Sequence, residues 1–197
     1  MPEDPQEHRP EPLVLFCTEF LSRHRNNWPP SEDTLAREFL SAFPVSPFLT
    51  RAEVEALCSG LRIEVSFRPL PSDFTGYNCK YGEKKEIVLG EKEAVLGVIT
   101  HSCFHEIREI IEGVFNDLGH SIALGNELEE RAEQFAVAVR MNSANKTFEF
   151  LLAEIDNISS TWRRWGSLIL VSILYLGHGA GCILLPHFEG RMTRDNN

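Results

Sequence analysis

The sequence predicts an α+β protein that is mostly helical, with a small sheet packed beside one long helix. Two observations predict this class. Apolar residues recur at helical spacing through most of the chain, in segments separated by proline- and glycine-containing breaks. Residues 61–90 instead show alternating apolar and polar residues and short apolar runs, as strands do. We therefore expect helices before and after a strand region in the middle of the chain.

The first third of the chain predicts a disordered segment followed by three helices. Residues 1–12 contain four prolines and are expected to be disordered. Helices are then predicted over about 13–24, 31–40 and 50–61. Ser31 is the expected N-cap of the second helix. Thr50 and Glu53 form a capping box on the third helix, and Gly60 is its expected end.

The middle and later parts predict three strands and three further helices. In LRIEVSFRPL, the side chains of Ile63, Val65 and Phe67 share one face, which is typical of a half-buried strand. Two more short strands are predicted near 77–81 and at EIVLG, residues 86–90. Helices are predicted over about 91–113, 127–141 and 146–158, with DLGHSIALGN as a loop.

Composition limits the classes of function. The 197 residues are 43% hydrophobic, which fits one domain over 13–160 with an extension over 161–197. The net charge of -10 and the lack of a basic cluster argue against direct binding of nucleic acid. The five cysteines form no C-x-x-C pair, which excludes a zinc ribbon and a thioredoxin-type motif. With no recognisable signal peptide, the expected compartment is the cytoplasm.

The segment 167–186 has two interpretations. It holds about 20 uncharged residues, which is long enough to cross a bilayer. It also contains three glycines and His178, which divide it into two pieces of the size of buried elements. We favour a buried C-terminal helix over a membrane anchor.

The stretch HSCFHEIREIIE, residues 101–112, contains the candidate chemistry. In its H-E-I-R-E core, His105 and Glu109 stand four residues apart and so project from one face of a helix. That spacing lets both bind one metal ion. Glu106 is rotated by about 100° from His105, which places it beside the ion as a general base toward a metal-activated water. In the other register, His101 with His105, the base position would be Ser102, which cannot accept the proton.

A charged helix without a metal is the alternative interpretation of this stretch. With 7 histidines, H-E-x-x-E is expected by chance about 0.1 times in a chain of this composition. Glu109 would then face solvent. The following helix, ELEERAEQFA, favours the metal site, because its alanines allow close helix packing and Glu129 can supply a third ligand. Glu133 is the fallback third ligand, one turn later, and Glu130 is expected on the solvated face.

These motifs together resemble the ImmA/IrrE family of metallopeptidases, over about residues 50–160. In that family an H-E-x-x-H helix precedes a helix reading roughly E-x-x-A-(N/D/E)-x-F-A, and residues 129–136 read E-E-R-A-E-Q-F-A in register. The strand LRIEVSF and the Gly76-Tyr77 pair also fit. The sequence departs from the family at Glu109, which replaces the second histidine, and after Met141, where the family has proline.

The resemblance implies a zincin-like domain with the sheet beside the active-site helix. It implies His105, Glu109 and Glu129 as metal ligands and Glu106 as the catalytic base of an endopeptidase. The substrate would be a protein, such as a transcriptional repressor on a separate polypeptide. One divalent ion is expected, zinc first; because a ligand set with two carboxylates is harder than the family's set, manganese and iron are the alternatives. The alternative function is a catalytically silent sensor or scaffold that binds a protein.

Four other residues each have two interpretations, one as a functional residue and one as an ordinary structural or surface residue. His120 could steady an oxyanion or be an exposed loop histidine, and the second is favoured. His101 could bond a ligand carboxylate or lie on the helix surface. Tyr77 could line a substrate groove or cap the sheet. Cys103 is expected to be a buried, inert thiol.

Overall fold

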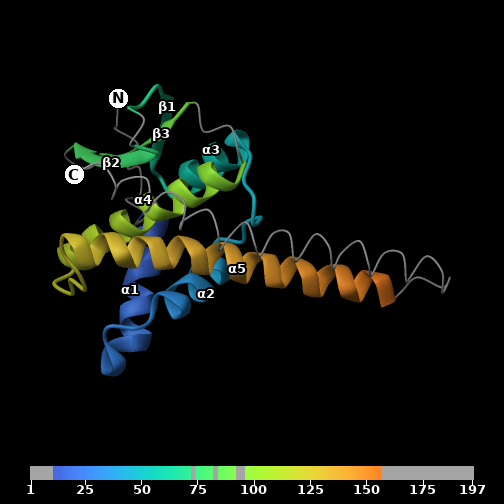
Figure 1. The fold of residues 1–197 in the computed structure, drawn as a ribbon. Coiled ribbons are helices and arrows are strands. Elements are labelled where there is room, and N and C mark those ends of the chain that lie inside the picture. Colours follow the sequence, from blue (N-terminus) through green and yellow to red (C-terminus); the bar gives the residue numbers. More distant parts are fainter. Residues whose placement is uncertain (1–10, 72–73, 82–83, 92–95, 157–197) are drawn as a thin grey trace, which may run out of the picture.

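The computed structural model describes residues 11–71, 74–81, 84–91 and 96–156 (Figure 1). Most of the segment predicted to be disordered and the whole of the extension 161–197 lie outside these residues. No helix within the described part is long and apolar enough to span a membrane. The apolar segment 167–186 is outside that part, so its two interpretations both remain.

The described residues form several helices and one small sheet, which confirms the α+β class. The helices are α1 (Pro12–His24), η1 (Arg25–Asn27, a 3₁₀ turn), α2 (Glu32–Ala42), α3 (Arg51–Gly60), α4 (Leu96–Asp117) and α5 (Asn126–Asp156). The strands are β1 (Glu64–Arg68), β2 (Gly76–Tyr81) and β3 (Lys84–Gly90). Figure 1 shows the sheet on one side of α4 and the helices α1 and α2 on the other.

The sheet has the strand order β1-β3-β2. β3 pairs in parallel with β1, where Val65 lies opposite Ile87, and antiparallel with β2, where Asn78 lies opposite Ile87. The inner residues of β3, from Ile87 to Gly90, are buried. In this strand order β2 forms one edge of the sheet, and it contacts α4.

The local signals for helix starts are confirmed. The Ser31 hydroxyl accepts a hydrogen bond from the Thr34 amide, and Thr50 and Glu53 form both bonds of the capping box. The helix α3 ends at Gly60 as predicted. The left-handed residue after it is Arg62, with φ of 58°.

The two helices predicted over 127–141 and 146–158 are wrong as separate elements, because α5 runs through both as one helix. The residues between them, NSAN, include neither glycine nor proline. Two of their polar side chains have partners in the folded chain: Asn142 donates to the carbonyl of Ala138 one turn back in the helix, and Ser143 donates to the carbonyl of Val45. Asparagine and serine therefore did not break the helix at this point.

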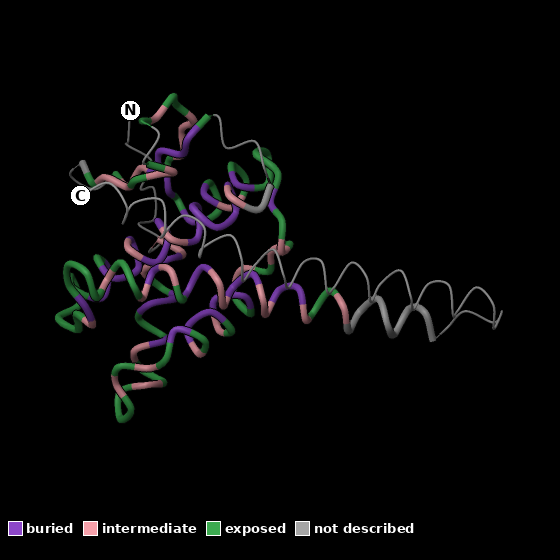
Figure 2. The backbone as a smooth tube through the Cα atoms, viewed as in Figure 1, coloured by how far each residue is buried: buried purple, intermediate pink, exposed green. Residues whose placement is uncertain are grey.

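The helix α4 lies at the centre of the core. Figure 2 shows that buried residues are concentrated along it. Phe104 of α4 contacts Phe39 of α2 edge-on, and Phe39 makes the same kind of contact with Phe16 of α1 and Phe135 of α5. One aromatic cluster thus fixes α4 against three other helices, while its opposite side faces the sheet.

A buried ion network also fixes α4. The Arg108 side chain is fully buried and donates two hydrogen bonds to Glu32 of α2, at 2.8 and 3.0 Å. It also bonds Glu112, one turn on, at 3.0 Å. Glu112 in turn accepts from the backbone amides of Ile122 and Ala123 in the loop before α5. The network therefore joins α2, α4 and the start of α5.

Candidate metal centre

A cavity of about 440 Å³ lies between β2, α4 and the first turns of α5. Two histidines, four glutamates and an asparagine line it, together with smaller and aromatic residues of β2 and the segment before it. These polar residues are His101, His105, Glu106, Glu109, Glu129, Glu133 and Asn78. Lysine and arginine are not among the lining residues. Among the described residues, the carboxylates that line the cavity thus outnumber the groups that can carry positive charge, which favours a cation.

The three predicted ligands converge. The Nε2 atom of His105 lies 3.8 Å from Oε1 of Glu109 and 3.3 Å from Oε2 of Glu129. One ligand atom from each residue lies within 4.8 Å of the other two. A tetrahedral ion with bonds of about 2 Å separates its ligand atoms by about 3.3 Å. This group has the residue types and the spacing for a three-ligand metal site.

Helix geometry explains this convergence. His105 and Glu109 lie on one face of α4, four residues apart, and each side chain is 20% exposed. Glu129 comes from the start of α5, which packs against α4, and its side chain is 65% exposed. The set is therefore half-buried and open to solvent on the α5 side.

Glu106 lies beside these ligands and is held by Asn78 of β2. The Asn78 amide nitrogen donates to Oε2 of Glu106 at 2.8 Å and also to Oε2 of Glu109. Burial raises the pKa of Glu106 to about 7, because the Asn78 bond and the His105 charge offset burial and the nearby carboxylates only in part. The pKa of Glu109 is also raised, by burial and by the charge of Glu129. An added cation would relieve this excess of negative charge.

Gly76 permits the close approach of β2 to Glu106. A Cβ atom at this position would lie 3.0 Å from Leu89 Cδ2, 3.2 Å from the Val88 carbonyl oxygen and 3.4 Å from Glu106 Oε1. The nearby backbone oxygen cannot rotate away as a flexible side chain can. A glycine is therefore needed where the edge strand meets the helix.

Substituting Gly76 by alanine is expected to lower the free energy of unfolding by about 1–3 kcal/mol, because the added methyl overpacks this junction. The matched control is Gly113→Ala in α4, where an added Cβ meets no atom within 4 Å. That variant is expected to gain up to about 1 kcal/mol from helix propensity. Urea unfolding measures both, and equal effects of the two substitutions would contradict the close-approach role of Gly76.

A second pair of contacts occupies the other side of His105. Oε2 of Glu133 lies 2.8 Å from Nε2 of His101 and 3.9 Å from Nδ1 of His105. Partial burial raises the pKa of Glu133, but the hydrogen bonds and charges of these two histidines outweigh it and lower the pKa to about 2. Burial lowers the pKa of His105, but the neighbouring carboxylates, Glu133 first, outweigh it and the pKa is raised. Glu133 thus contacts both histidines of α4.

The other residues singled out in the sequence take different positions. His120 is an exposed loop residue near Trp28, at 5.9 Å between ring centroids, and is not among the residues that line the cavity. Tyr77 lines the cavity and is 40% exposed. Cys103 is fully buried, as predicted, and its hydrogen bond with Cys58, together with burial, raises its pKa. Glu130 is exposed and accepts a bond from Gln134, as expected of a solvated face.

Asn78 is the cavity residue that no sequence motif predicted, whereas His101 bonds the fallback ligand Glu133, as its functional interpretation expected. Asn78 is 28 residues from Glu106 in sequence, and no spacing rule connects a strand asparagine to a later helix. His101 is buried rather than on the helix surface. Its i, i+4 relation to His105 was a signal in the sequence, but the partner carboxylate comes from another helix.

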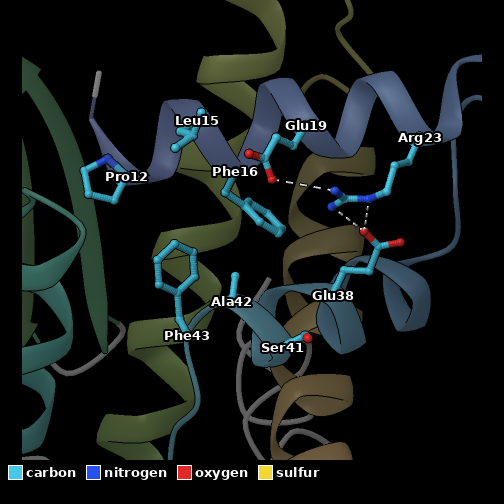
Figure 3. Close-up of a pocket in the computed structure, with 9 residues that line it drawn as sticks. All are labelled: Pro12, Leu15, Phe16, Glu19, Arg23, Glu38, Ser41, Ala42 and Phe43. Atoms are coloured by element: carbon cyan, nitrogen blue, oxygen red, sulfur yellow. Dashed lines mark hydrogen bonds and ion pairs between the residues drawn. The ribbon is translucent and has the colours of Figure 1, made fainter. Parts of the chain in front are cut away.

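A larger cavity, of about 580 Å³, lies between α1 and α2 (Figure 3). Its charged side chains pair with one another. Arg23 lies 2.7 Å from Glu38 and 3.7 Å from Glu19, as the dashed lines in Figure 3 show. The carboxylates here are thus already paired with arginine, unlike those in the cavity around His105.

Comparisons with family models, with curated proteins and with solved structures found no match to this chain. The chemistry of the cavity must therefore be inferred from its own residues.

Proposed function

We propose that the protein is a metal-dependent endopeptidase with a zincin-like arrangement of its active site. The observation that carries this proposal is the convergence of His105, Glu109 and Glu129, with Glu106 joined by Asn78 to the same group. One divalent ion fits this donor set, because one imidazole and two carboxylates face a cavity in which no described lysine or arginine is among the lining residues. Zinc, manganese and iron are the candidates, and the two carboxylates favour manganese and iron more than a two-histidine set would.

The residues of the chain have distinct roles in this proposal. His105, Glu109 and Glu129 would hold the ion, and their half-open side leaves room for water and substrate. A divalent ion in such a site polarises a carbonyl and lowers the pKa of water. Glu106 would take the proton from the attacking water and pass it to the leaving amine, while Asn78 holds its carboxylate in place.

A protein or peptide substrate fits the edge of the sheet. β2 pairs only with β3 among the described strands, so its other edge can take an extended peptide as an added strand. The exposed rings of Phe74 and Tyr77 lie along the same cavity and offer apolar contacts to substrate side chains. A regulatory repressor on a separate chain is the kind of substrate that the family resemblance suggests, with the reaction in the cytoplasm.

Metal analysis of the full chain tests the proposal. Wild type is expected to hold about one Mn²⁺ per chain, and Glu109→His is expected to shift selectivity from Mn²⁺ toward Zn²⁺ by about tenfold, since imidazole suits zinc better. Glu130→Gln, beside Glu129 but on the solvated face, is the matched control and should bind as wild type does. If neither wild type nor Glu109→His holds an ion near this stoichiometry, the proposed enzyme is ruled out.

A catalytically silent sensor or scaffold is the second candidate function. The observation that favours it is the glutamate at position 109, which weakens the acidification of water compared with histidine. A metal-bound form without hydrolysis, whose cellular role survives Glu106→Gln, would support this candidate over the enzyme.

A further inference from the structure

We propose that His101, His105 and Glu133 form a second metal-ligand set, which binds a nitrogen-preferring ion such as Zn²⁺ on the opposite side of the His105 ring from Glu109 and Glu129. This site goes beyond the proposed function but shares His105 with it. One ligand atom from each of the three residues lies within 4.8 Å of the other two. Two imidazoles and one carboxylate are a common three-residue set for zinc.

The helix α4 presents both histidines to one partner. His101 and His105 are four residues apart, the spacing at which two histidines on a helix face can bind one ion. Glu133 reaches them from α5, at 2.8 Å from His101 Nε2 and 3.9 Å from His105 Nδ1. These two distances lie on either side of the spacing of about 3.3 Å between ligand atoms in a tetrahedral zinc site.

Buried polar atoms without partners provide an independent observation. The His101 residue is only 8% exposed and its side chain points at Glu133 in the cavity. Its Nδ1 atom, together with Ser102 Oγ and Glu133 Oε1, is buried without a hydrogen-bond partner among the described residues. Leaving such atoms unsatisfied is unfavourable in a purely structural site. Glu133 Oε1 in particular is a free ligand atom that an ion beside Oε2 could recruit.

The two ligand sets use different nitrogens of one ring. His105 faces Glu109 and Glu129 with Nε2 and faces Glu133 with Nδ1. A neutral imidazole has a single lone pair, because its other nitrogen carries a proton. Only one set can therefore use His105 at a time, and each chain should bind one ion in total.

Ion type should decide which set is filled. Imidazole ligands suit zinc, whereas carboxylate ligands suit manganese. Zinc is thus expected in the histidine-rich set and manganese in the set of Glu109 and Glu129. Asn78 joins the proposed base Glu106 to Glu109, which belongs to the carboxylate-rich set and not to the histidine-rich one.

Binding of Zn²⁺ alone and of Mn²⁺ alone to the full chain tests this inference. His101→Gln retains a side-chain donor for Glu133 but removes the imidazole, and it should weaken Zn²⁺ binding at least tenfold while changing Mn²⁺ binding less than threefold. Glu129→Gln should do the reverse. Glu133→Gln is a second variant for the histidine-rich set, and it should also weaken Zn²⁺ binding if His101→Gln does not fold. His120→Gln, an exposed histidine outside the cavity, is the control and should change neither.

The possible results separate the two sites. If Zn²⁺ and Mn²⁺ compete for a total of one ion per chain, the result supports the inference that both ligand sets use His105. Two ions bound to one chain at the same time would overturn that inference. If His101→Gln weakens both ions equally, His101 only positions His105 through Glu133, and the second set is wrong. Zn²⁺ binding that depends on Glu129 and not on His101 also overturns it but leaves the proposed function intact. Zn²⁺ binding that depends on His101, with no Mn²⁺ binding by wild type, supports the second set and overturns the catalytic one.

Discussion

Replacing Glu106 by glutamine is expected to reduce peptide hydrolysis by about 10²–10⁴-fold, because it removes the proposed general base. Glutamine has nearly the same size, and it can still accept the hydrogen bond from Asn78 through its carbonyl oxygen. Glu106 is not among the three predicted ligands, so metal binding should stay within a few-fold of wild type. The measurement is cleavage of an unstructured protein substrate by metal-loaded protein, with metal content determined on the same sample.

The matched control is Glu130→Gln, which makes the same change of one carboxylate to an amide on the exposed face of α5. It should leave cleavage unchanged. Loss of metal together with activity in Glu106→Gln would instead make Glu106 a ligand. Full hydrolysis by Glu106→Gln would contradict its role as the base, and the proposed mechanism would then be wrong.

Features set by neighbouring residues could be predicted from the sequence. Ser31 and Thr50 cap their helices through residues three positions away, so their roles depend on local geometry alone. The pairing of His105 with Glu109 is similar, since any α-helix places residues four apart on one face. Glu129 lies on the next helix, where no spacing rule applies, and was predicted from the alanines around it and from the family resemblance. The structure brings Glu129 to 3.3 Å from His105.

Features that depend on contacts between distant segments could not be predicted. The parallel pairing of β1 with β3 requires the chain to place β2 on the outer edge, and strand patterns alone leave that order open. Asn78 reaches Glu106 only because Gly76 lets the edge strand approach α4. Arg108 lies inside the H-E-I-R-E motif, and arginine is mostly exposed in proteins. It is instead fully buried, against a glutamate 76 positions earlier.

Replacing this buried Arg108 by methionine is expected to lower the free energy of unfolding by about 3–5 kcal/mol, as loss of one partner in a buried ion network does. Methionine fills much of the volume but leaves the carboxylates of Glu32 and Glu112, which are 5% and 4% exposed, without their shared cation. Arg131, at 3.2 Å from Glu32, offsets only part of this loss. The exposed pair of Arg37 with Asp33 provides the control, because Arg37→Ala should cost less than about 1 kcal/mol.

A triple variant separates charge from packing in this network. Adding Glu32→Gln and Glu112→Gln to Arg108→Met removes the two uncompensated charges, and the new side-chain carbonyl at position 112 could still accept from the amides of the loop before α5. Urea unfolding should therefore show the triple variant to be more stable than Arg108→Met alone. If it is no more stable, lost packing around Arg108 and not buried charge accounts for the effect. Because Glu112 holds the loop that leads to Glu129, Arg108→Met should also weaken Mn²⁺ binding, although Arg108 is not among the residues that line the cavity.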